Sequence, residues 1–337
     1  MIRHLKKICF VGILLLTWPS CQTDQKNDVG FINTVNGRIS VEKLKFALTH
    51  EHIMSNFGAE ANYLPQYQRD SLFDQVLPYL KSIKALGVST IFDCTTAYFG
   101  RDVNILKALA DASGMQLITN TGFYGAANDR YVPEFAFKQN AAEISKRWIA
   151  EFDNGIDQTG IKPGFIKLAF DNGAPSEIDI KLFVAGILTH LSTGLTIAVH
   201  TGDNPLAAAK QLALLEEHQV SPEAWIWVHA NKVKNEQLLI DAAKKGAWIS
   251  LDGVKEANVA EYIRKIGYFK AQNLLHKVLL SHDGNSFPRG GKIRTYEAIS
   301  KNLIPALKEQ GYTDEEIDQL MVKNPQQAFA IKIRTSP

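Results

Sequence analysis

Short apolar runs recur at regular intervals along most of this 337-residue chain. They are rich in β-branched and aromatic residues, and their length is that of a strand. Eight such runs lie at residues 46–52, 88–95, 116–124, 164–170, 196–202, 224–231, 247–253 and 277–283. The chain is therefore expected to build its core around eight strands.

The stretches between these runs repeat apolar residues at spacings of three and four, which is typical of helices that cover a sheet. They lie at residues 70–87, 102–114, 134–152, 178–194, 205–218, 235–246, 259–269 and 296–311. No linker, low-complexity tract or charge block interrupts the pattern after Gly30. Eight strand–helix pairs predict an α/β fold, a single-domain (β/α)8 TIM barrel over residues 30–335.

Polar side chains stand at the ends of five of the predicted strands. They are His50, His52, Lys167, His200, His229 and Asp283. His50 and His52 are two residues apart in a strand and so point the same way. In a barrel the C-terminal strand ends form the active site, and closure brings Asp283 beside His50 and His52. Imidazole and carboxylate ligands favour zinc and related divalent ions, so these residues are predicted to bind metal.

Lys167 is the unusual member of this set, because an ammonium group repels cations. Reaction of its amine with CO₂ would give a carbamate able to bridge two metal ions, and burial among apolar neighbours favours the reactive neutral amine. The alternative is a structural lysine that pairs with Asp171 or Asp283.

The remaining histidines and the single internal cysteine are given ordinary roles. His190, His218 and His276 are expected to be surface or capping residues. Strand alternation turns His282 away from the barrel interior, where it could reach the site only through an intermediate hydrogen bond. Cys94 is expected to be a small buried filler rather than a nucleophile.

The first residues resemble an export signal. Residues 1–20 have a basic start and an apolar stretch about half the ~20 residues that a transmembrane helix needs. Cys21 and the polar linker 21–29 follow, as in a bacterial lipoprotein whose Cys21 carries lipid and anchors the protein to a membrane. Ordinary cleavage, with release as a periplasmic protein, is the alternative.

The charge after removal of this signal argues against a nucleic-acid partner. Residues 1–20 contain three of the 37 Lys and Arg and none of the 35 Asp and Glu, so the formal net charge becomes about −1. No basic field remains to attract nucleic acid. The expected partner is a small-molecule substrate.

Several motifs, in this order along the chain, resemble the phosphotriesterase family within the amidohydrolase superfamily. They are THEH at 49–52, GRD at 100–102, TGFY at 121–124, FIKLA at 165–169, HTG at 200–202, SHD at 281–283 and NPQQAF at 324–329. The resemblance implies a binuclear, usually zinc, centre in a homodimer-forming family.

The resemblance also implies a role for each residue of the site. His50, His52 and Asp283 would hold the more buried metal, His200 and His229 the more exposed one, and carboxylated Lys167 would bridge both. A hydroxide between the metals would attack the substrate, and Asp283 would take its proton. Tyr124 matches a tyrosine that lactonase-like members place beside the substrate. The alternative for Tyr124 is an aromatic wall residue without a specific role.

Three departures from the family pattern concern the substrate. Gly253 stands where many lactonase-like members have arginine, and the segment 251–263 leaves room for only a short loop, which predicts a more open pocket. Ala230, Asn231 and Lys232 follow His229 where relatives often have an acidic residue.

We therefore predict an exported hydrolase of a small ester, lactone, amide or phosphoester. The alternatives are a surface lipoprotein that binds a ligand without turnover, and a mononuclear enzyme in which only His50, His52 and Asp283 hold metal.

Overall fold

The computed structural model describes residues 30–59 and 67–336. The predicted export signal 1–20, the lipidated Cys21 and the linker 21–29 lie outside these residues. Within the described part of the chain, no helix combines the length and the apolar character needed to cross a membrane.

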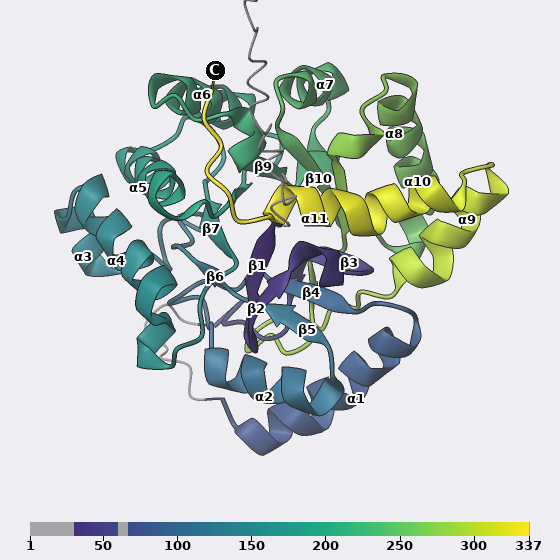
Figure 1. Cartoon of the computed structure of the whole chain (residues 1–337), viewed down its shortest axis with the longest axis horizontal. Coiled ribbons are helices and arrows are strands. Elements are labelled where there is room, and N and C mark those ends of the chain that lie inside the picture. Colours follow the sequence, from purple (N-terminus) through teal and green to yellow (C-terminus); the bar gives the residue numbers. More distant parts are fainter. Residues whose placement is uncertain (1–29, 60–66, 337) are drawn as a thin grey trace, which may run out of the picture.

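All eight predicted strands are present at the centre of the molecule (Figure 1). They are β3 (Ala47–His52), β4 (Thr90–Asp93), β5 (Gln116–Ile118) with its continuation β6 (Asn120–Thr121), β7 (Phe165–Ala169), β8 (Ile197–His200), β9 (Trp225–Val228), β10 (Trp248–Asp252) and β11 (Val278–Ser281). A short strand β12 (Gly284–Asn285) follows β11. Every pairing among these strands is parallel.

The strands form two sheets, ordered β11-β10-β9-β8-β7-β6 and β12-β3-β4-β5. Only Thr119 separates β5 from β6, and only His282 and Asp283 separate β11 from β12. Each sheet therefore continues into the other at both edges. This α/β arrangement of parallel strands is consistent with the predicted eight-stranded barrel.

Helices surround the strands in Figure 1 and follow the predicted stretches closely. They are α1 (Arg69–Ala85), α2 (Val103–Ser113), α3 (Glu134–Lys138), α4 (Ala141–Asn154), α5 (Glu177–Thr193), α6 (Pro205–Glu217), α7 (Glu236–Lys244), α8 (Val259–Ala271), α9 (Ile304–Glu309), α10 (Asp314–Asp318) and α11 (Asn324–Phe329).

Two predicted helices differ in detail. The stretch 134–152 is two helices, because Asn140 starts α4 with a capping box in which its side chain accepts the Glu143 N–H and the Glu143 carboxylate accepts the Asn140 N–H. The stretch 296–311 contains a π-helical segment, Ile299–Leu303, before α9.

The sequence prediction missed the elements that cover the N-terminal ends of the strands. These are the antiparallel hairpin β1 (Phe31–Thr34) and β2 (Gly37–Ser40), and α11. Figure 1 shows them crossing the central strands on the viewed side. Ile32 of β1 and Phe329 of α11 belong to the same buried apolar cluster as Phe92 and Phe165 from inside the strands. The hairpin and α11 thus close this end of the interior.

Candidate metal centre

A pocket of about 200 Å³ lies at the C-terminal ends of the strands. Its lining residues are His50, His52, Phe57, Phe99, Tyr124, Lys167, His200, His229, Lys232, Asp283, Asn285 and Arg294. The structure thus brings together all six predicted metal ligands, together with Tyr124. The connection from β10 to α8 is short, as predicted from residues 251–263, because only residues 253–258 separate the two elements.

His50 and His52 come from the end of β3 and are both buried. His50 Nδ1 lies 2.8 Å from Asp252 Oδ2, and His52 Nδ1 lies 2.8 Å from Thr95 Oγ1. A partner on Nδ1 fixes the ring and leaves Nε2 as the ligand atom. The two Nε2 atoms lie 3.7 and 3.5 Å from Asp283 Oδ1. This geometry orients both rings toward one point beside Asp283.

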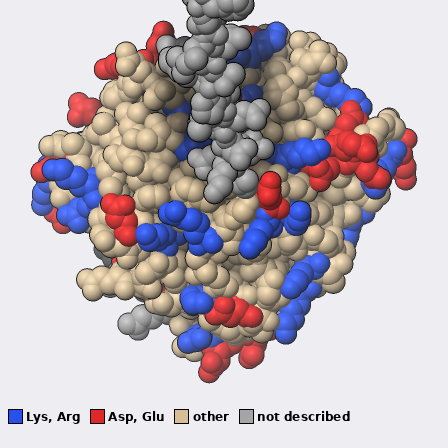
Figure 2. All heavy atoms as spheres, in the orientation of Figure 1, with Lys and Arg blue, Asp and Glu red and all other residues tan. Residues whose placement is uncertain are grey.

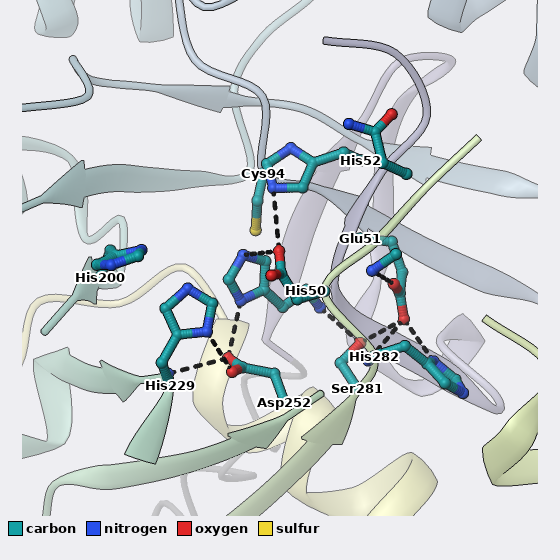
Figure 3. A network of polar contacts seen from close by, with 12 residues as sticks. His50, Glu51, His52, Cys94, His200, His229, Asp252, Ser281 and His282 are labelled. Carbon is teal, nitrogen blue, oxygen red and sulfur yellow. Dashed lines mark hydrogen bonds and ion pairs between the residues drawn. The ribbon is translucent and has the colours of Figure 1, made fainter. Parts of the chain in front are cut away.

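Asp252 is the functional residue that the sequence prediction missed. It stands between two imidazoles, with its carboxylate oxygens 2.8 Å from His50 Nδ1 and 2.5 Å from His229 Nδ1 (Figure 3). It also accepts the backbone N–H of His229 and the hydroxyl of Ser250. The signal was present, because Asp252 ends the predicted strand 247–253 in the same way that the predicted ligands end theirs.

Two of the predicted ligands depend on backbone that is rare for residues with a side chain. His229 has φ of 61° and Asp283 has φ of 53°. These left-handed conformations interrupt strand alternation one residue after β9 and two residues after β11. Such strain persists where the surroundings hold it, commonly at functional sites.

Lys167 is completely buried at the middle of β7. Its Nζ lies 3.3 Å from the backbone oxygen of Leu168 and 5.5 Å from the centre of the Tyr124 ring. Among residues 30–59 and 67–336, no carboxylate oxygen lies within 4.0 Å of this Nζ, so the alternative pairing with Asp171 or Asp283 is absent. Burial lowers the pKa of Lys167.

His200 lies beside His229, with ring centres 4.2 Å apart. Its Nδ1 is 3.3 Å from the Tyr124 hydroxyl, and the Tyr124 ring stacks on Phe99 at 4.8 Å. Burial lowers the pKa of His200 well below its usual value, and it also lowers the pKa values of His52 and His229. Neutral imidazole is the form that binds metal.

The pKa values of the two aspartates are also lowered, but the cause is different. Burial alone would raise the pKa of Asp252 and of Asp283, but the adjacent histidines outweigh it and hold both pKa values below the usual range. The site therefore favours neutral imidazoles at His52, His200 and His229 and ionised carboxylates at Asp252 and Asp283. Burial raises the pKa of the Cys94 thiol, as expected for the buried filler predicted at that position.

A second polar network lies behind the pocket (Figure 3). The buried Glu51 carboxylate accepts bonds from Ser281 Oγ at 2.7 Å, from the backbone N–H of Gly284 at 2.6 Å, and pairs with His282 Nδ1 at 2.7 Å. Ser281 Oγ in turn accepts the His50 N–H. His282 does not line the pocket, as predicted, but it reaches His50 through Glu51 and Ser281.

His190 corrects one prediction. It is fully buried rather than a surface residue. Its Nδ1 lies 2.9 Å from the Leu195 carbonyl, and its Nε2 accepts the Arg334 N–H. His190 therefore ties the end of α5 to the C-terminal segment, a tertiary contact that helical spacing does not reveal.

The donor set fits a divalent metal. His50, His52 and Asp283 offer ligand atoms within 4.8 Å of one another, and a second such group is His50, His229 and Asp252. Since Nδ1 of His50 and of His229 is occupied by Asp252, we assign Asp252 to orientation of the rings rather than to ligation.

Comparison with known proteins gives a single family. The model of the phosphotriesterase family matches residues 30–329, which confirms the resemblance predicted from the motifs. The phosphotriesterase homology protein of Escherichia coli (strain K12) is 24% identical over 300 residues, covering 86% of this chain and all of that protein.

Two further relatives carry names that state an activity. The aryldialkylphosphatase of Saccharolobus solfataricus is 26% identical, covering 87% of this chain and 98% of its own length. The N-acetyltaurine hydrolase of Mus musculus is 23% identical, covering 90% of this chain and 99% of its own length. The family and these relatives point to a hydrolase.

Proposed function

The chain belongs to the phosphotriesterase family, and on that premise we propose that it is a binuclear metal-dependent hydrolase of small ester, lactone, amide or phosphoester bonds. The observation that carries the proposal is the convergence of His50, His52 and Asp283 on one point while Asp252 orients His50 and His229 together. The continuity of the two sheets at both edges supports the closed (β/α)8 barrel that would hold this centre.

Each residue of the pocket has a proposed place in the centre. His50 and His52 hold one ion with Asp283, and His200 and His229 hold the other. Zinc suits this donor set. Lys167 would bridge the two as a carbamate, which would form when its neutral amine adds to CO₂ and releases a proton. Within residues 30–59 and 67–336 this fully buried amine has no carboxylate partner, which supports that assignment.

Two such ions, when bound, lower the pKa of a water and neutralise charge that develops on the substrate. Asp283 is ionised and faces the pocket, so it accepts the proton of the attacking water. The Tyr124 hydroxyl orients the substrate oxygen. Stacking on Phe99 holds its ring in place.

The size and wall of the pocket support a small substrate. One relative is named for hydrolysis of a phosphate ester and another for hydrolysis of an amide, so both bond types belong to the proposed range. Gly253 in place of arginine argues against a lactone-specific site, and the short β10–α8 connection favours a more open pocket. We favour carboxyl-type substrates over phosphotriesters.

The proposal extends to location and assembly. Residues 1–20 would direct export, with Cys21 lipidated and anchoring the enzyme to a membrane, or with release to the periplasm. A homodimer is proposed from the family. Basic and acidic side chains are interspersed on the face in Figure 2, which supports a small-molecule partner rather than nucleic acid.

The test is metal content with activity. Wild-type protein expressed with zinc should contain near two metal ions per chain and hydrolyse members of a panel of aryl esters, lactones, amides and phosphotriesters. Lys167→Ala should lose metal and activity together. Lys265→Ala is the matched control, because Lys265 is also buried but pairs with Glu236 at 2.8 Å.

Each alternative has its own outcome in this experiment. One metal ion in both wild type and Lys167→Ala, with activity kept, would replace the binuclear centre by a mononuclear one. Metal without hydrolysis of any substrate would favour the ligand-binding lipoprotein.

A further inference from the structure

The pocket carries more positive charge than its predicted metal ligands require. Lys232 and Arg294 line it beside the predicted metal ligands, and among the described lining residues Asp283 is the only carboxylate. None of the roles proposed above uses Lys232 or Arg294. They come from separate segments, Lys232 after β9 and Arg294 after β12.

Lys232 is an exposed cation held at the rim of the pocket. It ends the 3₁₀ turn Ala230–Lys232, and its backbone N–H bonds the carbonyl of His229. In the described part of the chain, no carboxylate oxygen lies within 4.0 Å of its Nζ.

Arg294 is fixed more firmly. Its backbone pairs with Asn285 in both directions, at 2.7 and 3.0 Å. Its Nε donates to the Asp283 carbonyl at 2.7 Å, and its guanidinium lies over the Phe57 ring at 5.3 Å. Arginine has five N–H donors. The bonds to Asp283 use only two of its nitrogens and leave donors for a ligand.

We propose that the physiological substrate carries a singly charged anionic group, a carboxylate or sulfonate, on a short stem, and that Lys232 and Arg294 bind this group. This inference rests on the proposed hydrolase. The stem would lie along Phe57 and Phe99, with the scissile bond near Tyr124. Lys232 belongs to the segment after His229 in which relatives often have an acidic residue, and it is then a determinant of specificity.

The first test compares two esters with the same leaving group. One is 4-nitrophenyl butyrate, which is neutral, and the other is mono-4-nitrophenyl glutarate, which carries a carboxylate at the end of the acyl chain. The ratio of kcat/KM for the charged ester to that for the neutral one should fall about ten-fold or more in Lys232→Gln, the effect of losing one hydrogen bond to a charged group.

The matched control is Lys234→Gln. Lys234 is an exposed lysine two residues away that does not line the pocket, so the variant makes the same change in net charge. Its ratio should equal that of wild type. Arg294 is left intact because it also contacts Asp283.

The second test measures binding without turnover. Full-length wild-type protein should bind 1-propanesulfonate in a calorimetric titration about ten-fold more tightly than Lys232→Gln does. A sulfonate is chosen because it is a poor metal ligand, and the Lys234→Gln control should bind as wild type does.

The outcomes separate this inference from the proposed function. Lys232-dependent sulfonate binding without any hydrolysis supports the anion site while the hydrolase fails. Metal-dependent hydrolysis with an unchanged ester ratio and no Lys232-dependent binding overturns the anion site and leaves the hydrolase standing. The absence of both hydrolysis and Lys232-dependent sulfonate binding would overturn both the hydrolase and the anion site.

Discussion

The two ends of the strand interior are built from the same strands with opposite chemistry. Phe165 lies in the apolar cluster and Lys167, two residues on, lies in the pocket. The same step leads from Ala198 to His200. The two residues of each pair point to the same side of their strand. Their position along the strand decides whether they contact the apolar cluster or the pocket. The closed end is covered by β1 and α11, whereas the other end opens into the pocket.

The difference assigns stability to the closed end of the strands and chemistry to the pocket end. At the closed end, Phe92, Phe165 and Phe329 pack their rings together, and apolar burial stabilises the fold. At the pocket end, buried polar groups cost free energy unless each has a partner. Asp252 and Glu51 supply those partners, and so allow histidines and carboxylates to gather where a core would otherwise form.

The largest effect is expected at the pocket end. Asp283→Asn keeps the size of the side chain but removes the charge that accepts a proton, so kcat should fall about 10²–10⁴-fold with the fold intact. Ester hydrolysis with saturating metal and circular dichroism check this. Asp203→Asn, which changes an aspartate outside the pocket lining, should behave as wild type. Equal activity of the two variants would remove Asp283 from the chemistry.

A substitution at the closed end should affect stability alone. Phe329→Ala removes a buried ring that packs on Phe92 at 4.1 Å, and should lower the free energy of unfolding by about 3–5 kcal/mol. Urea unfolding measures this, and kcat/KM of the folded protein should not change. The control Phe137→Ala alters an exposed ring and should cost under about 0.5 kcal/mol. A large loss of kcat/KM in Phe329→Ala would show that the two ends are coupled.

A smaller effect is expected from the residue that orients the ligands. Asp252→Asn cannot accept a bond from both His50 and His229, because its amide nitrogen is a donor. Metal affinity should fall about 10–100-fold. Competition with a chromogenic chelator measures the affinity. Asp241→Asn, at an exposed aspartate of α7, is the control. Unchanged affinity in Asp252→Asn would mean that the rings are held by packing alone.

The last prediction concerns pH and the metal-free protein. Unfolding returns His52, His200 and His229 to a pKa of about 6.5. Because burial lowers these pKa values in the folded state, the unfolded chain binds more protons below about pH 6.5 and acid favours unfolding. Each histidine contributes up to about 1.4 kcal/mol per pH unit.

Chelator-treated protein should therefore unfold at lower urea concentration as pH falls from about 7.5 to 5. The depressed pKa values of Asp252 and Asp283 add to the loss only at lower pH, near the unfolded value of about 4. A midpoint that stays constant over the higher range would mean that the folded histidines titrate normally.

Much of the site was predictable because each of its residues stands where a local pattern ends. His50, Lys167 and His200 follow apolar runs whose composition alone identifies strands, and the common topology of parallel strands brings those ends together. Asp252 also ends a predicted strand, but its segment contains no second residue of a type that binds metal. Glu51 was hidden between two histidines, and His190 within an ordinary helical pattern.

The sequence by itself determined the alternation of eight strands with helices, the direction of the inward side chains and the family. Tertiary structure alone decided which of these residues form hydrogen bonds with one another. His50 and Asp252 are 202 residues apart, and Glu51 and His282 are 231 apart. Their hydrogen bonds exist only once the sheets meet, and no local pattern in the chain encodes a partner at that distance. The same holds for the hairpin and α11. Their apolar residues pack against the strand interior only in the folded protein, at the end of the strands opposite the pocket.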